Sequence, residues 1–600
     1  MCGILGVYSR NGPLPLLDAI ELLRHRGPDG EGRRVFDRCA LAMRRLAIID
    51  LATGDQPVEN ERGDVVAIVN GEIYNYRELR AELAARGHVF RGEGDVEVVP
   101  HLYEELGERC FERLRGMFAI ALWDDSNQQL LLARDRFGIK PLYVAYSPHG
   151  LVFGSELRPL LALGVSDELD AQAVADYLSL GYVPAPATGL RAVRALAPGH
   201  VLVDGQERPY SSFEPEHDAP LEETLAEAVR LHLRSDVPLA VLLSGGVDSS
   251  LVAALAADEL DEPLRTFSVG FADAELDERP HARVVAEAIG SIHRELVVET
   301  DVADDLPEIA ARLEQPVADV AAIPLWYLCR AVADEVKVAL AGDGGDEVFG
   351  GYARYAWDPR AARIGRMLPA PLLARVPPLD GGRRSVGRRA TKLLRNAAKP
   401  EAARYLSWFA VVPDEVRADV LLRAAEPPER VYERLLDDAP ASLTALGRLQ
   451  YVDVRSFLAD NLLLKADRLS MAHSLELRVP FLDHRVVAAG LGLPDREKVQ
   501  GVRTKIALRR LVERRFGREL AARPKQGFDA PIDRWLRGEL RDLAGDSLSG
   551  LDGVVDVAAA RRVLDRHAAG AIGTGQPLYA LLMLSLWRAG LRQPQWTTAT

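Results

Sequence analysis

The sequence contains little cysteine, which limits how a chain of this length can be stabilised. Its 600 residues include only Cys2, Cys39, Cys110 and Cys329, and these are far apart. The spacing excludes a disulfide framework and offers no close cysteine pair of the kind that zinc sites use. We therefore expect a protein of the reducing cytoplasm.

Long apolar runs are also missing. A membrane-spanning helix needs about 20 consecutive apolar residues, and the best run, residues 578–587, is about half that length. The N-terminus lacks the charged segment of a secretion signal, and its apolar stretch at residues 4–8 is interrupted by Gly6. We expect neither a membrane span nor a signal peptide.

Basic residues are fewer than acidic residues in this chain. The chain has 74 Lys and Arg against 88 Asp and Glu, a net charge of −14, within an ordinary composition of 48% hydrophobic and 27% charged residues. This balance argues against a general nucleic-acid binder and against docking on anionic membranes, although local groups can still hold small anions. A basic stretch at residues 383–395 departs from the balance. We interpret it as a solvated surface, with anionic-ligand or nucleic-acid binding as the alternative.

Two patterns follow each other along the chain and meet near residue 215. Length alone allows about four domains, or two large ones. Residues 1–160 are predicted to be rich in β-structure, with strands at 65–69, 118–123, 129–133 and 151–154 and helices at 76–86 and 96–106. A segment with many prolines then leads to the boundary. We accordingly divide the chain into domains of residues 1–215 and 216–600.

The second domain is predicted to begin with an amphipathic helix, since Leu221, Leu225, Val229 and Leu233 recur every four residues. Strands are then predicted at 239–243, 266–269, 295–298 and 336–340, with helices starting near residues 249, 278 and 303. This alternation predicts a parallel sheet with helices on both faces, and the fourth strand closes the series. From about residue 400 the pattern is mostly helical.

Cys2 directly follows Met1 and is a candidate nucleophile. If Met1 is removed, one residue carries both a thiol and an α-amine, and such an amine titrates near about 8, where it can accept the thiol proton. Cysteine at this position is a weak signal by itself. Further motifs of the first domain are RHRGPDG (24–30), RRLAIID (44–50), NGEIYN (70–75), GDVEVV (94–99) and RDRFGIKPLYV (134–144).

In this order, the motifs resemble the glutaminase domain of the class II glutamine amidotransferases, which has an N-terminal-nucleophile αββα sandwich fold. The resemblance implies that Cys2 attacks the carboxamide of glutamine and forms a thioester. The side-chain amide of Asn70 and the backbone N–H of Gly71 would then form the oxyanion hole, in which one donor contributes about 3 kcal/mol.

The same resemblance assigns glutamine recognition to charged groups. Arg45 would bind the α-carboxylate through a bidentate fork, because a guanidinium matches a carboxylate in shape and charge. Asp95 and Glu72 occupy positions that hold the α-amino group and nearby atoms. Ile48 and Ile49, in the Arg45 motif, complete the predicted glutamine site.

The segment PLAVLLSGGVDSS (238–250) is predicted to be a strand, a glycine-rich turn and a helix start. Ser244, Gly245 and Gly246 are small enough for backbone N–H groups to approach a phosphate, and the helix start adds a positive end. Asp248 could hold magnesium. Hydroxyl donors could come from Ser249 and Ser250. The Walker lysine is missing, so this is not the common nucleotide-binding loop.

The segment instead resembles the SGGxDS loop of ATP pyrophosphatases, which split ATP between its α and β phosphates. LAGDGGDEVFGGY (340–352) resembles the turn that binds magnesium and pyrophosphate in the same group. It implies that Asp346 faces the metal and that Asp343 is an acid–base candidate. Leu243, Val269, Ala341 and Gly342 would border the nucleotide.

Two later motifs, at residues 460–483 and 525–538, resemble the C-terminal half of glutamine-dependent asparagine synthetases. Lys525 would neutralise charge on the adenylate and on pyrophosphate. Gln526 and Asp529 depart from the usual Met and Gly of this motif, which leaves the acceptor open.

The two halves together imply an α/β and α+β enzyme that uses ATP and Mg²⁺. Ammonia released from glutamine would pass through an internal tunnel and amidate the β-carboxylate of aspartate through β-aspartyl-AMP. One alternative is a related enzyme that amidates another carboxylate, in a peptide or a specialised metabolite. Another is a non-catalytic binding or regulatory relative. A homodimer is compatible with the sequence, and no nucleic-acid or membrane partner is expected.

Overall fold

The computed structural model describes residues 2–9, 14–15, 17–271, 277–298, 302–377, 386–525 and 530–592. Met1, Gln526 and Asp529 lie outside the described residues, as does the start of the basic stretch. In the described part of the chain, no helix is long and apolar enough to cross a membrane.

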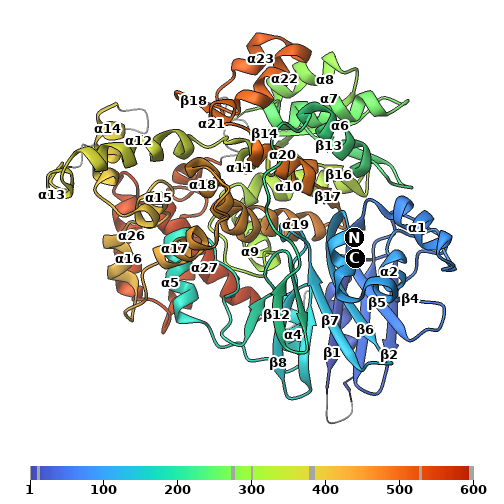
Figure 1. Cartoon of the computed structure of the whole chain (residues 1–600). Helices are drawn as coiled ribbons and strands as arrows, with labels where there is room; N and C mark the ends of the chain where they lie inside the picture. The colour runs from blue at the N-terminus through green and yellow to red at the C-terminus, as the bar shows by residue number, and fades with distance from the viewer. Residues whose placement is uncertain are drawn as a thin grey trace.

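The first half of the chain forms two antiparallel six-stranded sheets, with strand orders β10-β8-β9-β1-β3-β2 and β12-β11-β7-β6-β5-β4 (Figure 1). The prediction of a β-rich first half is confirmed, because β5, β6, β7 and β9 contain the four predicted runs. The strands are β1 (Cys2–Tyr8), β2 (Gly30–Val35), β3 (Cys39–Arg45), β4 (Val58–Glu59), β5 (Val65–Ile73), β6 (Gly116–Asp124), β7 (Gln129–Arg134), β8 (Tyr143–Ser147), β9 (Gly150–Gly154), β10 (Val193–Ala195), β11 (His200–Val203) and β12 (Gln206–Pro209).

Alternation along the strands explains how these sheets pack. Ile4 of β1 and Ile68 of β5 belong to a buried cluster between the two sheets. Leu5, the next residue of β1, faces the opposite side and packs with α4 (Leu157–Ala162) and α5 (Ala171–Leu180). Val69 of β5 likewise packs with α1 (Tyr76–Ala85) and α2 (Val98–Leu106). Because successive side chains point to opposite faces, this pattern gives the expected αββα sandwich.

The second half contains a parallel sheet of order β15-β14-β13-β16-β17. Its strands are β13 (Leu239–Leu242), β14 (Arg265–Phe271), β15 (Ile292–Val298), β16 (Val338–Leu340) and β17 (Glu476–Arg478). The prediction that the fourth strand closes the series was wrong, because β17 pairs with β16. This strand has three residues, two of them charged, and therefore lacks a readable apolar alternation.

Helices cover both faces of this sheet, as predicted. Val241 and Leu340 pack with α6 (Leu221–His232), α7 (Val247–Glu259) and α8 (Arg279–Ala288). Their neighbours Ala240 and Ala339 pack on the other face with α10 (Ala322–Ala333) and α19 (Leu464–Met471). A parallel sheet buried in this way is the arrangement that α/β folds require.

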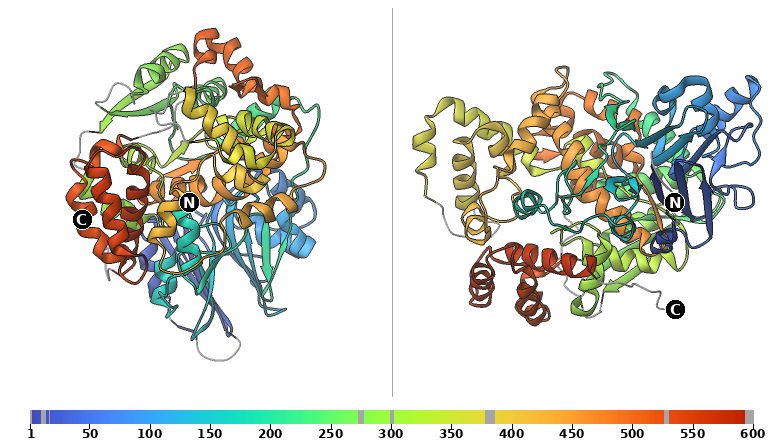
Figure 2. Two further views of the ribbon diagram at one scale, coloured as in Figure 1. Left: turned by 90° about the vertical axis from the view of Figure 1, so that its left-hand side faces the viewer. Right: turned by 90° about the horizontal axis from the view of Figure 1, so that it is seen from below.

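The remainder is mostly helical, which confirms the prediction for residues beyond about 400. Figure 2 shows α12 to α14 at the end of the molecule opposite the antiparallel sheets. The further helices are α3 (Cys110–Arg113), α9 (Val302–Arg312), α11 (Gly345–Phe349), α12 (Ala353–Met367), α13 (Ala370–Ala374), α14 (Val386–Ala397), α15 (Glu401–Leu406), α16 (Asp414–Val420), α17 (Glu429–Asp438), α18 (Ala445–Asp453), a π-helix (Val454–Leu463), α20 (His484–Gly492), α21 (Asp495–Lys498), α22 (Ile506–Phe516), α23 (Arg518–Ala522), α24 (Ile532–Trp535), α25 (Arg541–Ser547), α26 (Val557–Ala568) and α27 (Gly575–Leu591). A small hairpin pairs β18 (Val499–Gln500) with β19 (Arg503–Thr504).

Candidate active sites

Cys2 is the first residue of β1 and lies opposite Arg45 in the register with β3. Its side chain is buried, and Gln56 Nε2 lies 3.9 Å from its sulfur. Burial raises the pKa of the Cys2 thiol, since a thiolate loses hydration in an apolar setting. A base close to Cys2 is therefore needed for it to act as a nucleophile, and a free α-amine on the same residue would meet that need.

Asn70 and Gly71 belong to β5, and Asn70 contacts Cys2 of β1. The Cys2 backbone nitrogen donates to Asn70 Oδ1 at 3.1 Å. The other end of this amide, Asn70 Nδ2, is buried and has no hydrogen-bond partner among the described residues. Gly71 has φ +150°, and a Cβ there would lie 1.9 Å from the Met117 carbonyl oxygen. A free amide donor on a residue that contacts the Cys2 backbone is a feature that suits an oxyanion hole.

Arg45 points its guanidinium along the segment that follows it. Its Nη1 donates to Asp55 Oδ1 at 2.9 Å, and its Nη2 donates to the carbonyl oxygens of Ile49 and Asp50 at 3.3 and 2.5 Å. Ile48 is buried in the core beside α1 and α2, so its predicted contact with glutamine would have to come from its backbone.

Two buried carboxylates of the first domain, Asp95 and Glu72, influence each other electrostatically. Asp95 Oδ2 accepts a 2.7 Å hydrogen bond from the Ile73 backbone nitrogen, and burial raises the pKa of Asp95 to about 6. Burial, followed by the charges of Glu476 and Asp95, raises the pKa of Glu72 well above its ordinary value. Arg478 Nη2 lies 3.4 Å from Glu72 Oε2. Burial therefore disfavours ionisation of both carboxylates, and an incoming ammonium group would favour it.

A cavity of about 410 Å³ opens at the carboxyl ends of β13, β14 and β16, where ligands bind in open parallel sheets. Eight residues predicted to bind ATP line its wall: Leu243, Ser244, Gly246, Asp248, Ser249, Val269, Ala341 and Gly342. Ser244 Oγ and Ser249 Oγ are 3.0 Å apart, and the Ser244 backbone nitrogen donates to Ser249 Oγ at 3.2 Å. These bonds hold the turn that leads into α7.

Two residues of the predicted ATP site, Gly245 and Ser250, do not line this cavity. Gly245 has φ +68°, and a Cβ there would lie 2.5 Å from the backbone carbon of His281. Ser250 is fully buried on α7. Gly245 thus permits the tight turn and its packing against α8.

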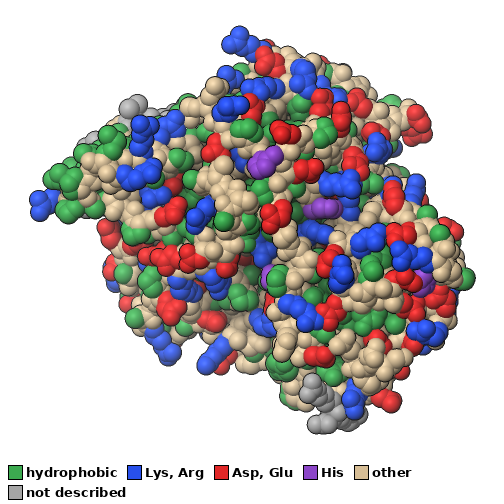
Figure 3. Space-filling model, in the orientation of Figure 1, with side chains coloured by type: hydrophobic (Ala, Val, Ile, Leu, Met, Phe, Trp, Pro, Cys, Tyr) green, Lys and Arg blue, Asp and Glu red, His purple; other side chains and the backbone are tan. Residues whose placement is uncertain are grey.

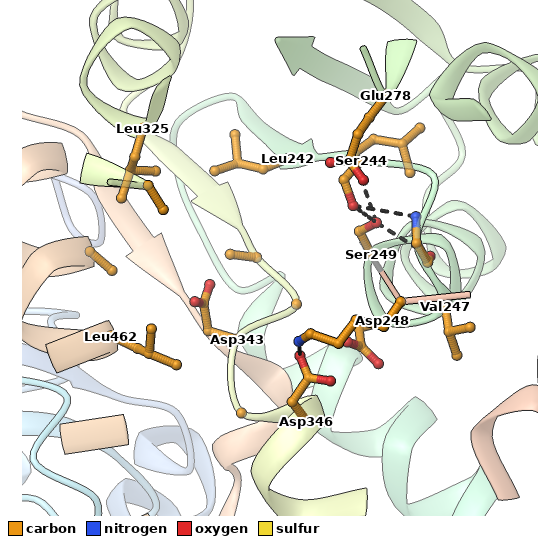
Figure 4. Close-up of a pocket in the computed structure, with 18 of the residues that line it drawn as sticks. Leu242, Ser244, Val247, Asp248, Ser249, Glu278, Leu325, Asp343, Asp346 and Leu462 are labelled. Atoms are coloured by element: carbon orange, nitrogen blue, oxygen red, sulfur yellow. Dashed lines mark hydrogen bonds and ion pairs between the residues drawn. The ribbon is translucent and has the colours of Figure 1, made fainter. Parts of the chain in front are cut away.

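Carboxylates from two elements face the cavity. Figure 4 shows Asp248, at the start of α7, near Asp343 and Asp346 of the loop after β16. Burial, partly offset by the charge of Lys465, raises the pKa of Asp343. Lys465 forms an ion pair with Asp319, and both line the same cavity. The sequence motifs identified the first three residues but gave no role to Lys465 or Asp319.

Lys505 is a further charged residue of this cavity that the sequence motifs did not indicate. Its ammonium forms an ion pair with Asp248 and lies 2.5 Å from Asp346 Oδ1. It sits at φ +54° immediately before α22, a strained conformation for a lysine. A single lysine outside a recognised motif gives no signal in the sequence. The structure does give one, because non-glycine residues in this backbone conformation cluster at functional sites.

Lys525, which the sequence did predict, forms an ion pair with Asp346. Burial opposes the charged form of Asp346, but the two nearby ammonium groups, Lys505 and Lys525, lower its pKa below the ordinary range. The cavity therefore combines anionic and cationic groups that can hold a metal ion and phosphate oxygens at once.

The donor set fits magnesium. Magnesium binds carboxylate and phosphate oxygens. Asp248 and Asp346 both lie close to one cation, the Lys505 ammonium, so a single site can use both carboxylates. Asp248 Oδ1 is also buried without a hydrogen-bond partner in the described part of the chain.

Buried ion pairs join the two candidate sites. Arg26 Nε donates to the Cys2 carbonyl oxygen at 3.2 Å, and its two terminal nitrogens contact Asp467 of α19 at 2.9 and 3.0 Å. Glu156 accepts from Arg26 and lies 3.1 Å from Arg468. Arg26 thus ties Cys2 to α19, which covers one face of the parallel sheet.

Comparisons with known proteins agree with this two-part arrangement. Residues 1–213 match the family described as Glutamine amidotransferase domain, and residues 220–589 match the family Asparagine synthase. The chain is 33% identical to asparagine synthetase [glutamine-hydrolyzing] 1 of Bacillus subtilis, over 98% of this chain and 96% of that protein. It is 37% identical to a putative asparagine synthetase [glutamine-hydrolyzing] of Mycobacterium tuberculosis, over 98% of this chain and 97% of that protein. The chain belongs to the family of glutamine-hydrolysing asparagine synthetases.

Proposed function

We propose that this protein makes asparagine from aspartate, with glutamine as the nitrogen source and ATP as the energy source. The observation that carries the proposal is the joint presence of a buried cysteine beside a free amide donor and of an acid- and lysine-lined cavity in one chain. The first feature suits hydrolysis of an amide, and the second suits activation of a carboxylate by ATP.

In the first site, the Cys2 thiolate attacks the side-chain carbonyl carbon of glutamine. Asn70 Nδ2 and the Gly71 N–H stabilise the developing oxyanion, and ammonia leaves while a thioester forms. Water then hydrolyses the thioester to glutamate. Arg45 binds the α-carboxylate and Asp95 the α-ammonium, which orients the carboxamide toward the sulfur.

In the second site, a β-carboxylate oxygen of aspartate attacks the α-phosphorus of ATP, and the bond to pyrophosphate breaks. Lys505 and Lys525 reduce the repulsion between two anions, and backbone N–H groups of the loop that begins at Ser244 hold phosphate oxygens. Asp248 and Asp346 would hold magnesium, which neutralises phosphate charge when bound. Ammonia from the first site then attacks the acyl carbon, and AMP leaves.

Asp343 and Lys465 are the candidate groups for the acceptor end of the second site. Both line the cavity, and the cationic Lys465 can attract a carboxylate while Asp343 accepts a proton from the attacking amine. The domain division at residue 215, an internal tunnel, a homodimer and a cytoplasmic location stay predictions.

Pyrophosphate release across a panel of free carboxylates and a carboxylate-bearing peptide tests the acceptor. We expect aspartate to give the largest rate, accompanied by one asparagine per pyrophosphate. Release above background with another acceptor and not with aspartate would establish a different amidation reaction.

The Cys2→Ala variant tests the division of labour between the two sites. It should lose glutamine-dependent asparagine synthesis and retain synthesis from added ammonium chloride. Cys110→Ala removes the thiol of another buried cysteine. This variant is the matched control and should keep both activities. Loss of both activities in a folded Cys2→Ala protein would contradict the two-site mechanism.

A further inference from the structure

Four side chains at the edge of the first domain converge on one point, and none of them belongs to either candidate active site. They are Glu61, in the turn between β4 and β5, His88, after α1, and His101 and Glu104, on α2. One ligand atom from each residue lies within 4.8 Å of the others. Figure 1 shows α1 and α2 beside β4 and β5 at this edge.

The individual distances suit a tetrahedral site. Zinc lies about 2.0–2.1 Å from nitrogen and oxygen ligands, so neighbouring ligand atoms in a tetrahedron are about 3.3 Å apart. His88 Nδ1 is 3.2 Å from Glu61 Oε1 and 3.8 Å from Glu104 Oε2. His101 Nδ1 is 3.3 Å from Glu61 Oε2 and 3.9 Å from Glu104 Oε2. Small side-chain movements would bring all four groups onto one ion.

His101 is the most deeply buried of the four candidate ligands. The residue is 0% exposed, and its Nε2 has no hydrogen-bond partner in the described part of the chain. A buried polar group without a partner costs about 1–3 kcal/mol. Its Nδ1 faces the Glu61 and Glu104 carboxylates, and Glu104 Oε2 also lacks a hydrogen-bond partner among the described residues. A metal ion would bind His101 Nδ1 and Glu104 Oε2 together.

Neighbouring residues orient His88 and Glu104 toward the cluster. His88 Nε2 pairs with Glu105 Oε1 at 3.2 Å, which leaves Nδ1 available, as in many metal sites where a carboxylate orients the imidazole. Arg62 holds the second oxygen of Glu104 at 3.0 Å, so that Oε2 remains directed at the cluster. Two imidazoles and two carboxylates form a mixed nitrogen and oxygen set. Such a set suits zinc, whereas magnesium and calcium prefer oxygen ligands alone.

We propose that Glu61, His88, His101 and Glu104 form a structural zinc site. It would cross-link the turn before β5, the end of α1 and the helix α2. Asp95 precedes α2 by three residues, so the same ion would also hold the segment that positions this carboxylate. The assignment does not depend on the reaction proposed above, since none of the four residues lies in either candidate active site.

Metal analysis of the full chain tests this site. The protein would be stripped with EDTA, incubated with excess zinc, desalted and analysed by mass spectrometry for metal content. We expect one zinc per chain in the wild-type protein and its loss in His101→Gln and His88→Gln. His149→Gln, which changes an exposed histidine, should retain the ion. Cys2→Ala and Asp248→Asn should also retain it, which separates this site from the two active sites.

Two further measurements keep the test decisive. If His101→Gln fails to fold by circular dichroism, Glu104→Gln, which preserves side-chain shape, takes its place. Hydrogen exchange should slow in residues 98–106 on zinc addition in the wild-type chain and not in the variant. The proposal would be overturned if the wild-type protein retained no zinc. It would also be overturned if the His88 and His101 variants retained as much zinc as the wild type.

Discussion

At the scale of single residues, Lys505 has the most direct chemical consequence. Its ammonium contacts Asp248 and Asp346, which come from separate elements, and it does so from a strained backbone conformation. Burial opposes its charge, but the two carboxylates raise the pKa of Lys505. The lysine therefore stays protonated and can exchange a carboxylate for a phosphate oxygen when ATP enters.

We predict that Lys505→Ala reduces pyrophosphate formation by a factor of about 10²–10³, the usual effect of losing one transition-state contact. Glutamine hydrolysis should continue, because Lys505 lies in the second site. Lys399→Ala, which removes an exposed lysine, is the control. A pyrophosphate rate within a factor of two of the wild type would remove Lys505 from the mechanism.

The raised pKa of Asp95 predicts a pH dependence for the first site. Its pKa is raised to about 6, so the carboxylate is neutral below that pH and ionised above it. Pairing with the glutamine ammonium needs the ionised form. The value of kcat/KM for glutamine should therefore fall as pH drops below about 6, since this ratio reports the free enzyme. The measurement is a pH profile of glutaminase rate, and Asp95→Asn should lower kcat/KM and abolish this inflection.

At the scale of elements, β5 shows how a strand can position a site. It pairs along its whole length with β6, and its residues Asn70 and Gly71 lie opposite Ala119 and Phe118. The close approach of the Gly71 backbone to Met117 leaves no room for a side chain. A regular strand with one glycine thus places an amide and a backbone N–H together near Cys2.

We predict that Gly71→Ala forces β5 and β6 apart, because the added Cβ would lie 1.9 Å from a carbonyl oxygen. The strain should cost about 1–3 kcal/mol of unfolding free energy and abolish glutaminase activity. Chemical denaturation and a glutamate assay measure the two effects. Gly87→Ala provides a glycine control with a positive φ and no neighbouring atom within 4 Å. A fully active Gly71→Ala protein would contradict the proposed oxyanion hole.

The elements also show what the sequence could predict. The four apolar runs of the first half and the alternating strands β13 to β16 were found, because burial imposes readable periodicity on long elements. Strand β17 was missed, since three residues with charged ends give no period. Motifs found Asp248, Asp346 and Lys525, whereas Lys505 reaches the same cavity from a segment without a motif.

At the scale of the whole molecule, buried charge joins the two halves. Arg26 connects the Cys2 carbonyl to Asp467 of α19, and Arg478 of β17 lies beside Glu72 of β5. The surface is different: Figure 3 shows Lys and Arg interspersed with Asp and Glu on the face that it draws. The charges that connect the halves are thus buried in the protein interior. Their interactions are stronger there than in water, because the dielectric constant is lower.

We predict that Asp467→Asn destabilises the protein by about 3–5 kcal/mol, because it leaves Arg26 buried without its main counter-charge. It should also release more glutamate per asparagine formed, since the two halves lose a connection. Denaturant titration and a product ratio provide the measurements. Glu168→Gln, which breaks the exposed pair with Arg191, should change stability by about 0–1 kcal/mol. Equal effects of the two substitutions would show that the buried contact has no special role.

The sequence by itself determined the order of the two halves, the main strands and the motif residues on which the family resemblance rests. These features are local, because periodicity, glycine at a turn and residue type within a motif can be read along the chain. Only the tertiary structure decided that β17 completes the sheet, that Lys505 joins Asp248 and Asp346, and that Glu61, His88, His101 and Glu104 meet. Each of these depends on distances between segments far apart in sequence, which burial and packing set and no local pattern encodes.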